Sequence, residues 1–429
     1  MAHVEQLVGS YRAWASNGAS GAPGWLKDLR EGGIARFHEL GFPNMKQEAW
    51  RFTSVAPIAE GSFEQAKPPA RIPTLEDIRP FLLLEAGYRL VFVDGFFQRS
   101  LSTPFFDDVQ SLAHVVAHRP DLVREHLGRY VATQDRAFSA LNTAFVNDGA
   151  FVHVPAKATI AEPIQLLFLA SGKPAVTHPR NLVVLEREAR ASIVETYASL
   201  GEGSYWTNSV TEIVVGEAAR LDYHRVQRES PSAYHVAATQ THQGRDSTVN
   251  VHAVAFGAAL ARHDIGAVMA GPGGTLILNG LYLLAGKQHT DHHTTIDHAA
   301  DHCQSHEYFN GVLDDTSRGV FTGRIIVRPG AQKTDSKQTN NNLLLSGQAH
   351  ADSQPQLEIY ADDVKCTHGS TVGPLDPRAL FYLQSRGVGE HEARRLLTYG
   401  FAAEVLGRME VAPLRAQLDA IVRGRLAES

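Results

Sequence analysis

The stretch QKTDSKQTNNNLLLSGQAHADSQPQLEIYADDVKCTH, from Gln332 to His368, contains short apolar runs separated by polar turns. The same organisation extends over residues 138–373, where β-rich runs recur and helical periodicity is absent. Such a pattern fits a β-sandwich, a β-barrel or a stacked β-solenoid. The triplet Asn340-Asn341-Asn342 favours the solenoid, because asparagine tolerates left-handed backbone at corners and can stack in ladders.

Cys366 and His368 end this stretch two residues apart. In an extended strand such residues share a face, so they could offer a thiolate and an imidazole to one metal ion. Iron-sulfur clusters and structural zinc usually take about four protein ligands, whereas this chain has 2 cysteines in total. The pair therefore predicts half a metal site, to be completed by another chain. Cys366 shares its strand parity with Val364, so its thiol should face inward and leave His368 as the better placed ligand.

Four regions are expected along the chain. Residues 1–85 form a helical N-terminal region that becomes proline-rich, and residues 86–137 form a connector with a hairpin signal at Asp94-Gly95 followed by a helical segment. Residues 138–375 are the β core. Residues 376–429 are C-terminal helices, with Asp376 as the first N-cap and Pro377 in the first turn. Because open solenoid ends invite aggregation, the helical flanks are expected to cap them, and partner docking is the alternative use of the C-terminal helices.

Composition limits the class of protein. With 429 residues, 43% hydrophobic and 20% charged, the chain suits a soluble globular protein with a large core. A net charge of −6 and a pI near 6.4 argue against a nucleic-acid-binding surface. No run approaches the roughly 18 apolar residues of a membrane span, and the first residues do not resemble a signal peptide, so a cytoplasmic location without membrane contact is expected.

A dense group of histidines is the second candidate for metal chemistry. It comprises His289, His292, His293, His298, His302 and His306, with Cys303 among them. The zincin spacing HExxH is absent, because a cysteine stands where that motif needs glutamate. These side chains are therefore interpreted as structural or interface histidines, and the cysteine as a small buried hydrophobe.

Other catalytic motifs are incomplete. The segment 280–288 resembles a phosphate-binding loop but has one residue too many and ends on Gln288, so a strand and a turn are predicted and no nucleotide site. Gly387-Val388-Gly389 lacks the rest of a dinucleotide fingerprint. The doublets at 314–315 and 362–363 are interpreted as solvated corner aspartates, because adjacent strand residues point to opposite faces.

Several motifs together resemble the SufB/SufD family of iron-sulfur cluster assembly scaffolds. They are EAWRFT (48–53), LNTAF (141–145), YFNGVL (308–313), QKTD (332–335), NLLLS (342–346), PQLEIYADDVKCTHG (355–369) and LFYLQSRG (380–387). They span nearly the whole chain and are specific as a set. SufB-like sequences carry His-Glu after the last strand, so His368-Gly369 fits the SufD branch.

The resemblance implies a right-handed parallel β-helix between helical regions, in a scaffold subunit that is not itself an enzyme. It implies pairing with SufB through the β-helix, and docking of the ATPase SufC on the C-terminal helices. The residues assigned to docking are Phe381, Tyr382, Ser385, Arg386 and Gly387. A transient iron-sulfur cluster shared with SufB is expected at the interface, where His368 matches the family histidine and Cys366 its neighbouring cysteine.

Two other functions stay open. A β-helical carbohydrate-active lyase or hydrolase shares the solenoid, but such enzymes are usually secreted and need paired carboxylates or calcium. A purely structural subunit without a ligand role is the third reading. Whether the isolated chain pairs with itself as a homodimer is left open by the sequence.

Overall fold

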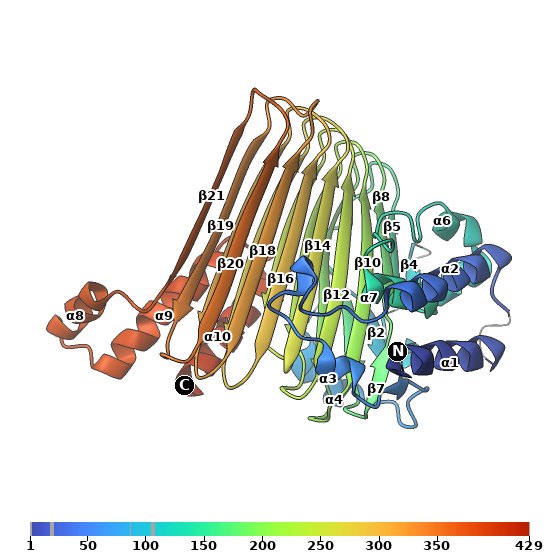
Figure 1. The fold of residues 1–429 in the computed structure, drawn as a ribbon, viewed down its shortest axis with the longest axis horizontal. Helices are drawn as coiled ribbons and strands as arrows, with labels where there is room; N and C mark the ends of the chain where they lie inside the picture. The colour runs from blue at the N-terminus through green and yellow to red at the C-terminus, as the bar shows by residue number, and fades with distance from the viewer. Residues whose placement is uncertain (1, 18–20, 86, 104–107, 429) are drawn as a thin grey trace.

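The computed structural model describes residues 2–17, 21–85, 87–103 and 108–428. Within these ranges the strands form two sheets of 11 and 10 strands, here called sheet A and sheet B. Successive strands alternate between the sheets and pair in parallel with the strand one turn earlier, which makes a β-solenoid of about 8 turns (Figure 1). The predicted solenoid with helical flanks is confirmed.

The strands of sheet A, in order from the C-terminal end, are β20 (His350–Ile359), β18 (Arg318–Val327), β16 (His289–His298), β14 (Leu260–Met269), β12 (Tyr234–Gln243), β10 (Trp206–Val215), β8 (Arg180–Leu185), β5 (Ala150–Val154) and β4 (Val109–Ser111), with β7 (Ala175–Thr177) and β1 (Glu64–Gln65) beside them. The strands of sheet B are β21 (Lys365–Gly373), β19 (Asp335–Leu344), β17 (Gln304–Leu313), β15 (Thr275–Leu284), β13 (Thr248–Ala255), β11 (Arg220–Arg228), β9 (Arg190–Ser199), β6 (Ile164–Ala170), β2 (Tyr88–Val93) and β3 (Phe96–Phe97).

Ten α-helices lie within the described ranges. Before the solenoid come α1 (Ala2–Asn17), α2 (Gly24–Leu40), α3 (Ala56–Ala59), α4 (Leu75–Ile78), α5 (Leu112–His118), α6 (Pro120–Arg124) and α7 (Ala137–Ala144). After it come α8 (Pro377–Ser385), α9 (Glu390–Leu406) and α10 (Ala412–Glu428). None of the helices in these ranges is both long and apolar enough to cross a bilayer.

The predicted hairpin at Asp94-Gly95 is confirmed. Asp94 and Gly95 both have positive φ, and β2 and β3 pair in an antiparallel manner on either side of them. A two-residue turn of this kind matches the twist of its flanking strands. β2 also pairs in parallel with β6, so the connector between the helices and the solenoid contributes a strand to sheet B.

The solenoid turns at corners where single residues adopt left-handed backbone. Between a sheet A strand and the next sheet B strand these residues are Glu188, Ala218, Asp246, Gly273, His302 and Lys333, one in each successive turn. The expectation that the asparagine triplet makes a corner is wrong, because residues 340–342 lie inside β19. The ladder is real. Asn341 Nδ2 donates to Asn310 Oδ1 (3.2 Å), its register partner, and Thr371 Oγ1 donates to Asn341 Oδ1 (2.8 Å).

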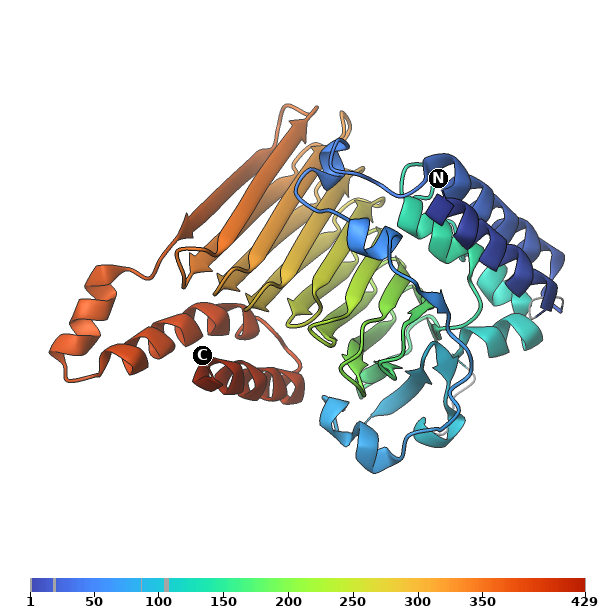
Figure 2. The same ribbon diagram turned by 60° about the horizontal axis from the view of Figure 1, so that its bottom comes forward.

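The helices cover the sides of the solenoid, so the expected C-terminal cap is also wrong. Helices α9 and α10 pack on sheet B, where residues such as Val405 and Leu418 meet Val254 and Leu281 in one buried cluster (Figure 2). Helices α1, α2 and α7 pack on sheet A around Trp206. Apolar side chains on the outer faces of these strands explain the arrangement, because burying them requires a cover on the sides.

The segment 41–55, here called the strap, crosses the outer face of sheet A between α2 and α3 (Figures 1 and 2). Trp50 lies under the guanidinium of Arg262, 3.8 Å from the ring centroid. The buried Thr53 donates to Asp291 Oδ2 (2.5 Å) and contacts His289 Nε2 (2.9 Å). The EAWRFT motif is thus an anchor that holds the N-terminal region on β14 and β16.

Candidate functional site

The last turn of the solenoid consists of β20 and β21, and no further strand pairs with it at the C-terminal end of either sheet in the described residues. Both are edge strands, and every residue of each is exposed or half-buried. Large apolar side chains are exposed here: Tyr360 is 60%, Val372 48% and Ile359 42% accessible. Open edges with apolar side chains are sites where another chain adds on, unless something covers them.

Cys366 and His368 lie on this open turn, on the side of β21 that faces the solenoid interior. Their register partners on β19 are Ser336 and Gln338, both buried. Cys366 packs against the interior apolar cluster, which confirms the predicted inward thiol, whereas His368 is exposed. Burial and the charge of Asp335 raise the pKa of the Cys366 thiol. In the described residues, no three His, Cys, Asp or Glu side chains form a group that could hold a metal ion.

A buried glutamate and glutamine lie in the same column beneath His368. Glu307 on β17 pairs in register with Gln338 on β19, which pairs with His368 on β21. Gln338 Nε2 donates to Glu307 Oε2 at 2.6 Å, and both side chains are buried. Burial raises the pKa of Glu307 to about 7, against the hydrogen bond from Gln338 that lowers it. The sequence reasoning missed this pair.

This raised pKa predicts how stability changes with pH. The folded chain favours the protonated form of Glu307. The contribution of this carboxyl group to folding stability is therefore fully present below its ordinary pKa of 4.5, and it is lost as the pH rises through about 7. The replacement Glu307→Gln, which cannot ionise, is expected to avoid a loss on the order of 3 kcal/mol. Unfolding of both proteins followed at pH 5 and pH 8 tests this: the gain from the substitution should grow with pH, and an equal difference at both pH values would contradict it.

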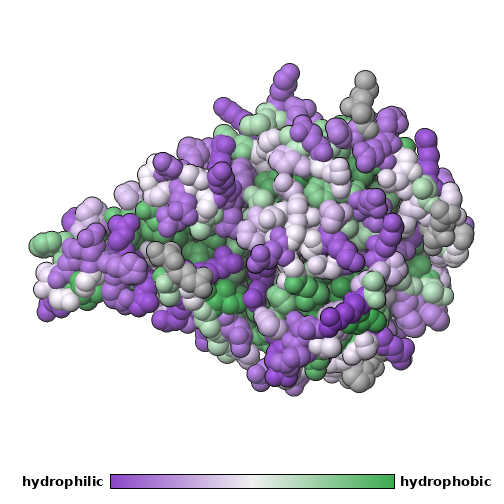
Figure 3. All heavy atoms as spheres, turned by 90° about the horizontal axis from the view of Figure 1, so that it is seen from below, coloured by the Kyte–Doolittle hydropathy of each residue, from purple (hydrophilic) through white to green (hydrophobic). Residues whose placement is uncertain are grey.

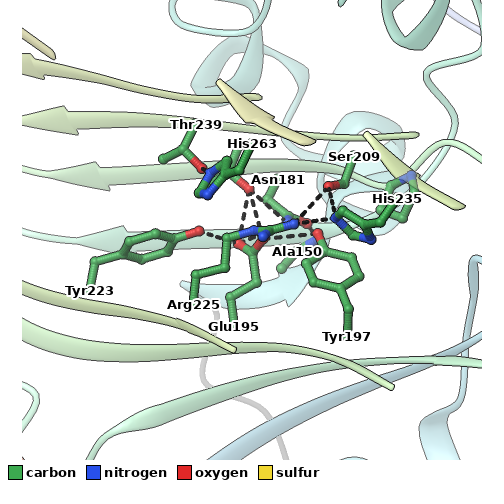
Figure 4. Close-up of polar contacts among 12 residues, drawn as sticks. Ala150, Asn181, Glu195, Tyr197, Ser209, Tyr223, Arg225, His235, Thr239 and His263 are labelled. Atoms are coloured by element: carbon green, nitrogen blue, oxygen red, sulfur yellow. Dashed lines mark hydrogen bonds and ion pairs between the residues drawn. The ribbon is translucent and has the colours of Figure 1, made fainter. Parts of the chain in front are cut away.

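A larger polar network occupies the interior near the first turns. Figure 4 shows Glu195 between the sheets, where it accepts hydrogen bonds from Tyr197 (2.9 Å), Tyr223 (2.9 Å) and Asn181 (3.1 Å). Arg225 Nε lies 3.6 Å from Glu195 Oε1. These residues are all buried, so their groups are paired with one another and not with solvent.

The six histidines between 289 and 306 do not converge. His292 and His298 point into the interior, and His289 and His293 flank Asp291 on the outer face of β16. His302 and His306 are exposed. Cys303 is buried, and desolvation raises the pKa of its thiol. The interpretation as structural histidines with a buried cysteine agrees with this arrangement.

The remaining weak motifs also lie where expected. The phosphate-loop-like segment is the end of β15 followed by a turn. Asp315 lies exposed at a corner with positive φ, and Asp362 and Asp363 are exposed in the loop before β21.

The C-terminal arm, defined as α8 and the turn at Gly387, projects from the solenoid (Figure 1). Asp376 caps α8 by accepting from the Arg378 backbone N–H (2.8 Å), as predicted. No residue of α8 is buried, and Phe381 and Tyr382 are 70% and 58% exposed. Hydrophobic residues lie among hydrophilic ones on this projection (Figure 3).

The other residues assigned to docking lie on the same arm. Ser385 Oγ donates to the Tyr382 carbonyl (2.7 Å), Arg386 lies 5.4 Å from the Tyr382 ring centroid, and Gly387 has a positive φ that ends the helix. The assigned residues therefore form one local surface.

Two models of known protein families match this chain, one after the other along the sequence. Residues 168–401 match the SufBD core domain of the SUF system for FeS cluster assembly, and residues 1–166 match the SufBD protein N-terminal region. The chain is 34% identical over 416 residues to a SufBD family iron-sulfur cluster assembly protein of Synechocystis, covering 93% of this chain and 91% of that protein.

Two relatives carry the name iron-sulfur cluster assembly protein SufD. The chain is 31% identical over 395 residues to the one from Escherichia coli, covering 90% of each protein. It is 27% identical over 431 residues to the one from Bacillus subtilis, covering 94% of each. The chain therefore belongs to the SufBD family, and its role in iron-sulfur cluster assembly is of the SufD type.

Proposed function

We propose that this chain is a non-catalytic scaffold subunit that joins a SufB-type β-solenoid edge to edge through β20 and β21. The observation that carries the proposal is the open last turn, with His368 exposed on it and apolar side chains at its rim. Two solenoids that meet there satisfy the free backbone groups of both edges and bury the rim.

The proposal places the nascent iron-sulfur cluster at the seam between the two chains. His368 supplies one nitrogen ligand, and the partner chain supplies the ligands that this chain lacks. Cys366 is the second candidate on this side. Its thiol is held protonated by burial in the isolated chain, and iron would have to displace that proton. The cysteines are both free thiols, in keeping with a reducing, cytoplasmic setting.

The arm supplies the second contact, with the SufC-type ATPase. Phe381 and Tyr382 are aromatic, exposed and unused by the fold, and such side chains are typical anchors of protein interfaces. Nucleotide is bound by that ATPase in this scheme and not by the present chain.

The ligand role is tested by His368→Ala in a complex reconstituted anaerobically from the three kinds of subunit. Cluster absorbance and delivery to an acceptor are expected to fall by at least about tenfold, the low end of what loss of even an outer partner of a metal ligand costs. The matched control is His306→Ala, because His306 is also an exposed strand histidine but lies on β17, two turns away from the edge in chain order. Normal cluster content in His368→Ala would reject the role.

The scaffold role is tested by mixing the purified chain with the SufB-type and SufC-type subunits and measuring the mass of the complex. One assembly containing all three subunits is expected. A chain that stays single in the mixture, or that pairs with itself in preference to the SufB-type subunit, would contradict the proposal.

A further inference from the structure

The column beneath His368 contains two buried acceptor atoms without a donor. Gln338 Nε2 faces Glu307, so the other atom of the amide, the Oε1 carbonyl oxygen, is left over. Within the described residues neither Gln338 Oε1 nor Glu307 Oε1 has a hydrogen-bond partner, although both side chains are at most 2% exposed. An unsatisfied buried acceptor is costly and indicates a partner that arrives from elsewhere.

The Gln338 amide occupies interior space that a side chain on the opposite strand would otherwise fill. Gly323 lies opposite it on β18, and a Cβ built at that glycine would stand 2.2 Å from Gln338 Nε2. The side chain of Gln338 therefore extends across the interior to sheet A. It lies directly under the last turn, because β19 is the strand on which β21 rests.

We infer that Gln338 and Glu307 are positioning residues for His368: Gln338 Oε1 accepts the N–H of one ring nitrogen of His368, which turns the other ring nitrogen toward the seam. The inference rests on the proposed function and deepens it. Metal-bound histidines usually donate their second ring N–H to a carbonyl or carboxylate, which fixes the tautomer and the ring orientation. The next residue in register below His368 carries such an acceptor.

The ionised carboxylate of Glu307 sets which end of the amide faces His368, because a carboxylate can only accept hydrogen bonds. Its Oε2 accepts from the Gln338 NH₂ group at 2.6 Å, and this contact holds the NH₂ end away from the edge. An amide turned the other way would present a donor to His368 and would favour the opposite tautomer. The carboxyl thus acts on His368 through Gln338 without touching it.

The variant Gln338→Met removes the acceptor and keeps the length of the side chain. In the assembled complex, ¹⁵N shifts of the His368 ring are expected to show one tautomer for the parent and a mixture for Gln338→Met. Cluster retention is expected to fall about 10- to 100-fold, the usual effect of losing such a partner.

A matched control and a rescue separate positioning from general stability. Gln227→Met removes another buried glutamine that donates to a buried glutamate, Glu229 (3.0 Å), on β11 near the first turns, and it should leave the His368 tautomer unchanged. The reciprocal exchange of Glu307→Gln with Gln338→Glu keeps the pair and places a carboxylate acceptor under His368. It is expected to restore a single tautomer, and it carries the test if Gln338→Met does not fold.

The outcomes distinguish this inference from the proposed function. An unchanged single tautomer in Gln338→Met overturns the inference, even where His368→Ala abolishes the cluster. Normal cluster content in His368→Ala overturns the ligand role, while the tautomer still decides whether Gln338 binds the ring.

Discussion

The double variant Phe381→Ala with Tyr382→Ala is expected to weaken binding of the SufC-type ATPase by at least about 100-fold. Exposed aromatic anchors commonly contribute about 2 kcal/mol or more each, and about 1.4 kcal/mol corresponds to a tenfold change in affinity. Both rings are more than half exposed on α8, which has no buried residue, so the chain itself does not use them for folding. Titration calorimetry with the purified ATPase measures the effect.

The control for this variant is Ile72→Ala, because Ile72 is also a large apolar residue, is 50% exposed, and lies in the N-terminal region away from the arm. Its affinity should equal that of the parent. Melting temperatures of both variants should also match the parent, since neither removes a buried contact. An unchanged affinity in the double variant would move the docking site away from the arm.

The variant Arg180→Met is expected to lower the free energy of unfolding by about 3–5 kcal/mol, the usual result of removing one partner of a buried ion pair. Arg180 and Glu212 are both at most 1% exposed, and Arg180 Nη2 lies 2.6 Å from Glu212 Oε2. Glu212 also accepts from the backbone N–H groups of Gly128 (2.8 Å) and Tyr130 (2.9 Å), which ties the connector to β10. Without the arginine, a carboxylate remains buried without its countercharge.

An exposed pair provides the comparison. Arg328 and Asp297 form a bidentate contact, but the Arg328 side chain is 55% exposed. Arg328→Met should therefore change stability by no more than about 1 kcal/mol. Denaturant unfolding of the two variants measures both effects, and similar values for the two would contradict the assigned importance of burial.

Much of the fold could be predicted because short stretches of sequence determine its strands, its hairpin and the start of α8. Alternating apolar runs indicated the strands, Asp94-Gly95 indicated the hairpin, and Asp376 with Pro377 indicated the start of α8. The asparagine triplet led to the right architecture through its ladder, not through a corner. Local residue preferences cannot reveal that Asn340 and Asn342 face the interior, whereas Asn341 forms the ladder on the outer face of sheet B.

The placement of the C-terminal helices was not predictable in the same way. An amphipathic helix shows that it will bury a face but does not show against what. Val405 and Leu418 could equally have covered the end of the solenoid. In the structure they pack against the apolar outer face of sheet B.

The candidate site was partly visible in the sequence. The inward thiol of Cys366 followed from strand parity alone. The column of Glu307, Gln338 and His368 did not, because it depends on register across three turns. Aligning successive turns of the chain with one another is the signal that could have found it, since the three residues then fall at one position.

The connection between the arm and the edge strand is short. Gly373 ends β21 and Pro377 begins α8, so residues 374–376 form the whole tether. A tether of this length spans little more than about 10 Å even when fully extended. A displacement of the arm larger than this span must therefore pull on β21 itself. Mechanical work done on the arm would then reach the very strand that carries His368.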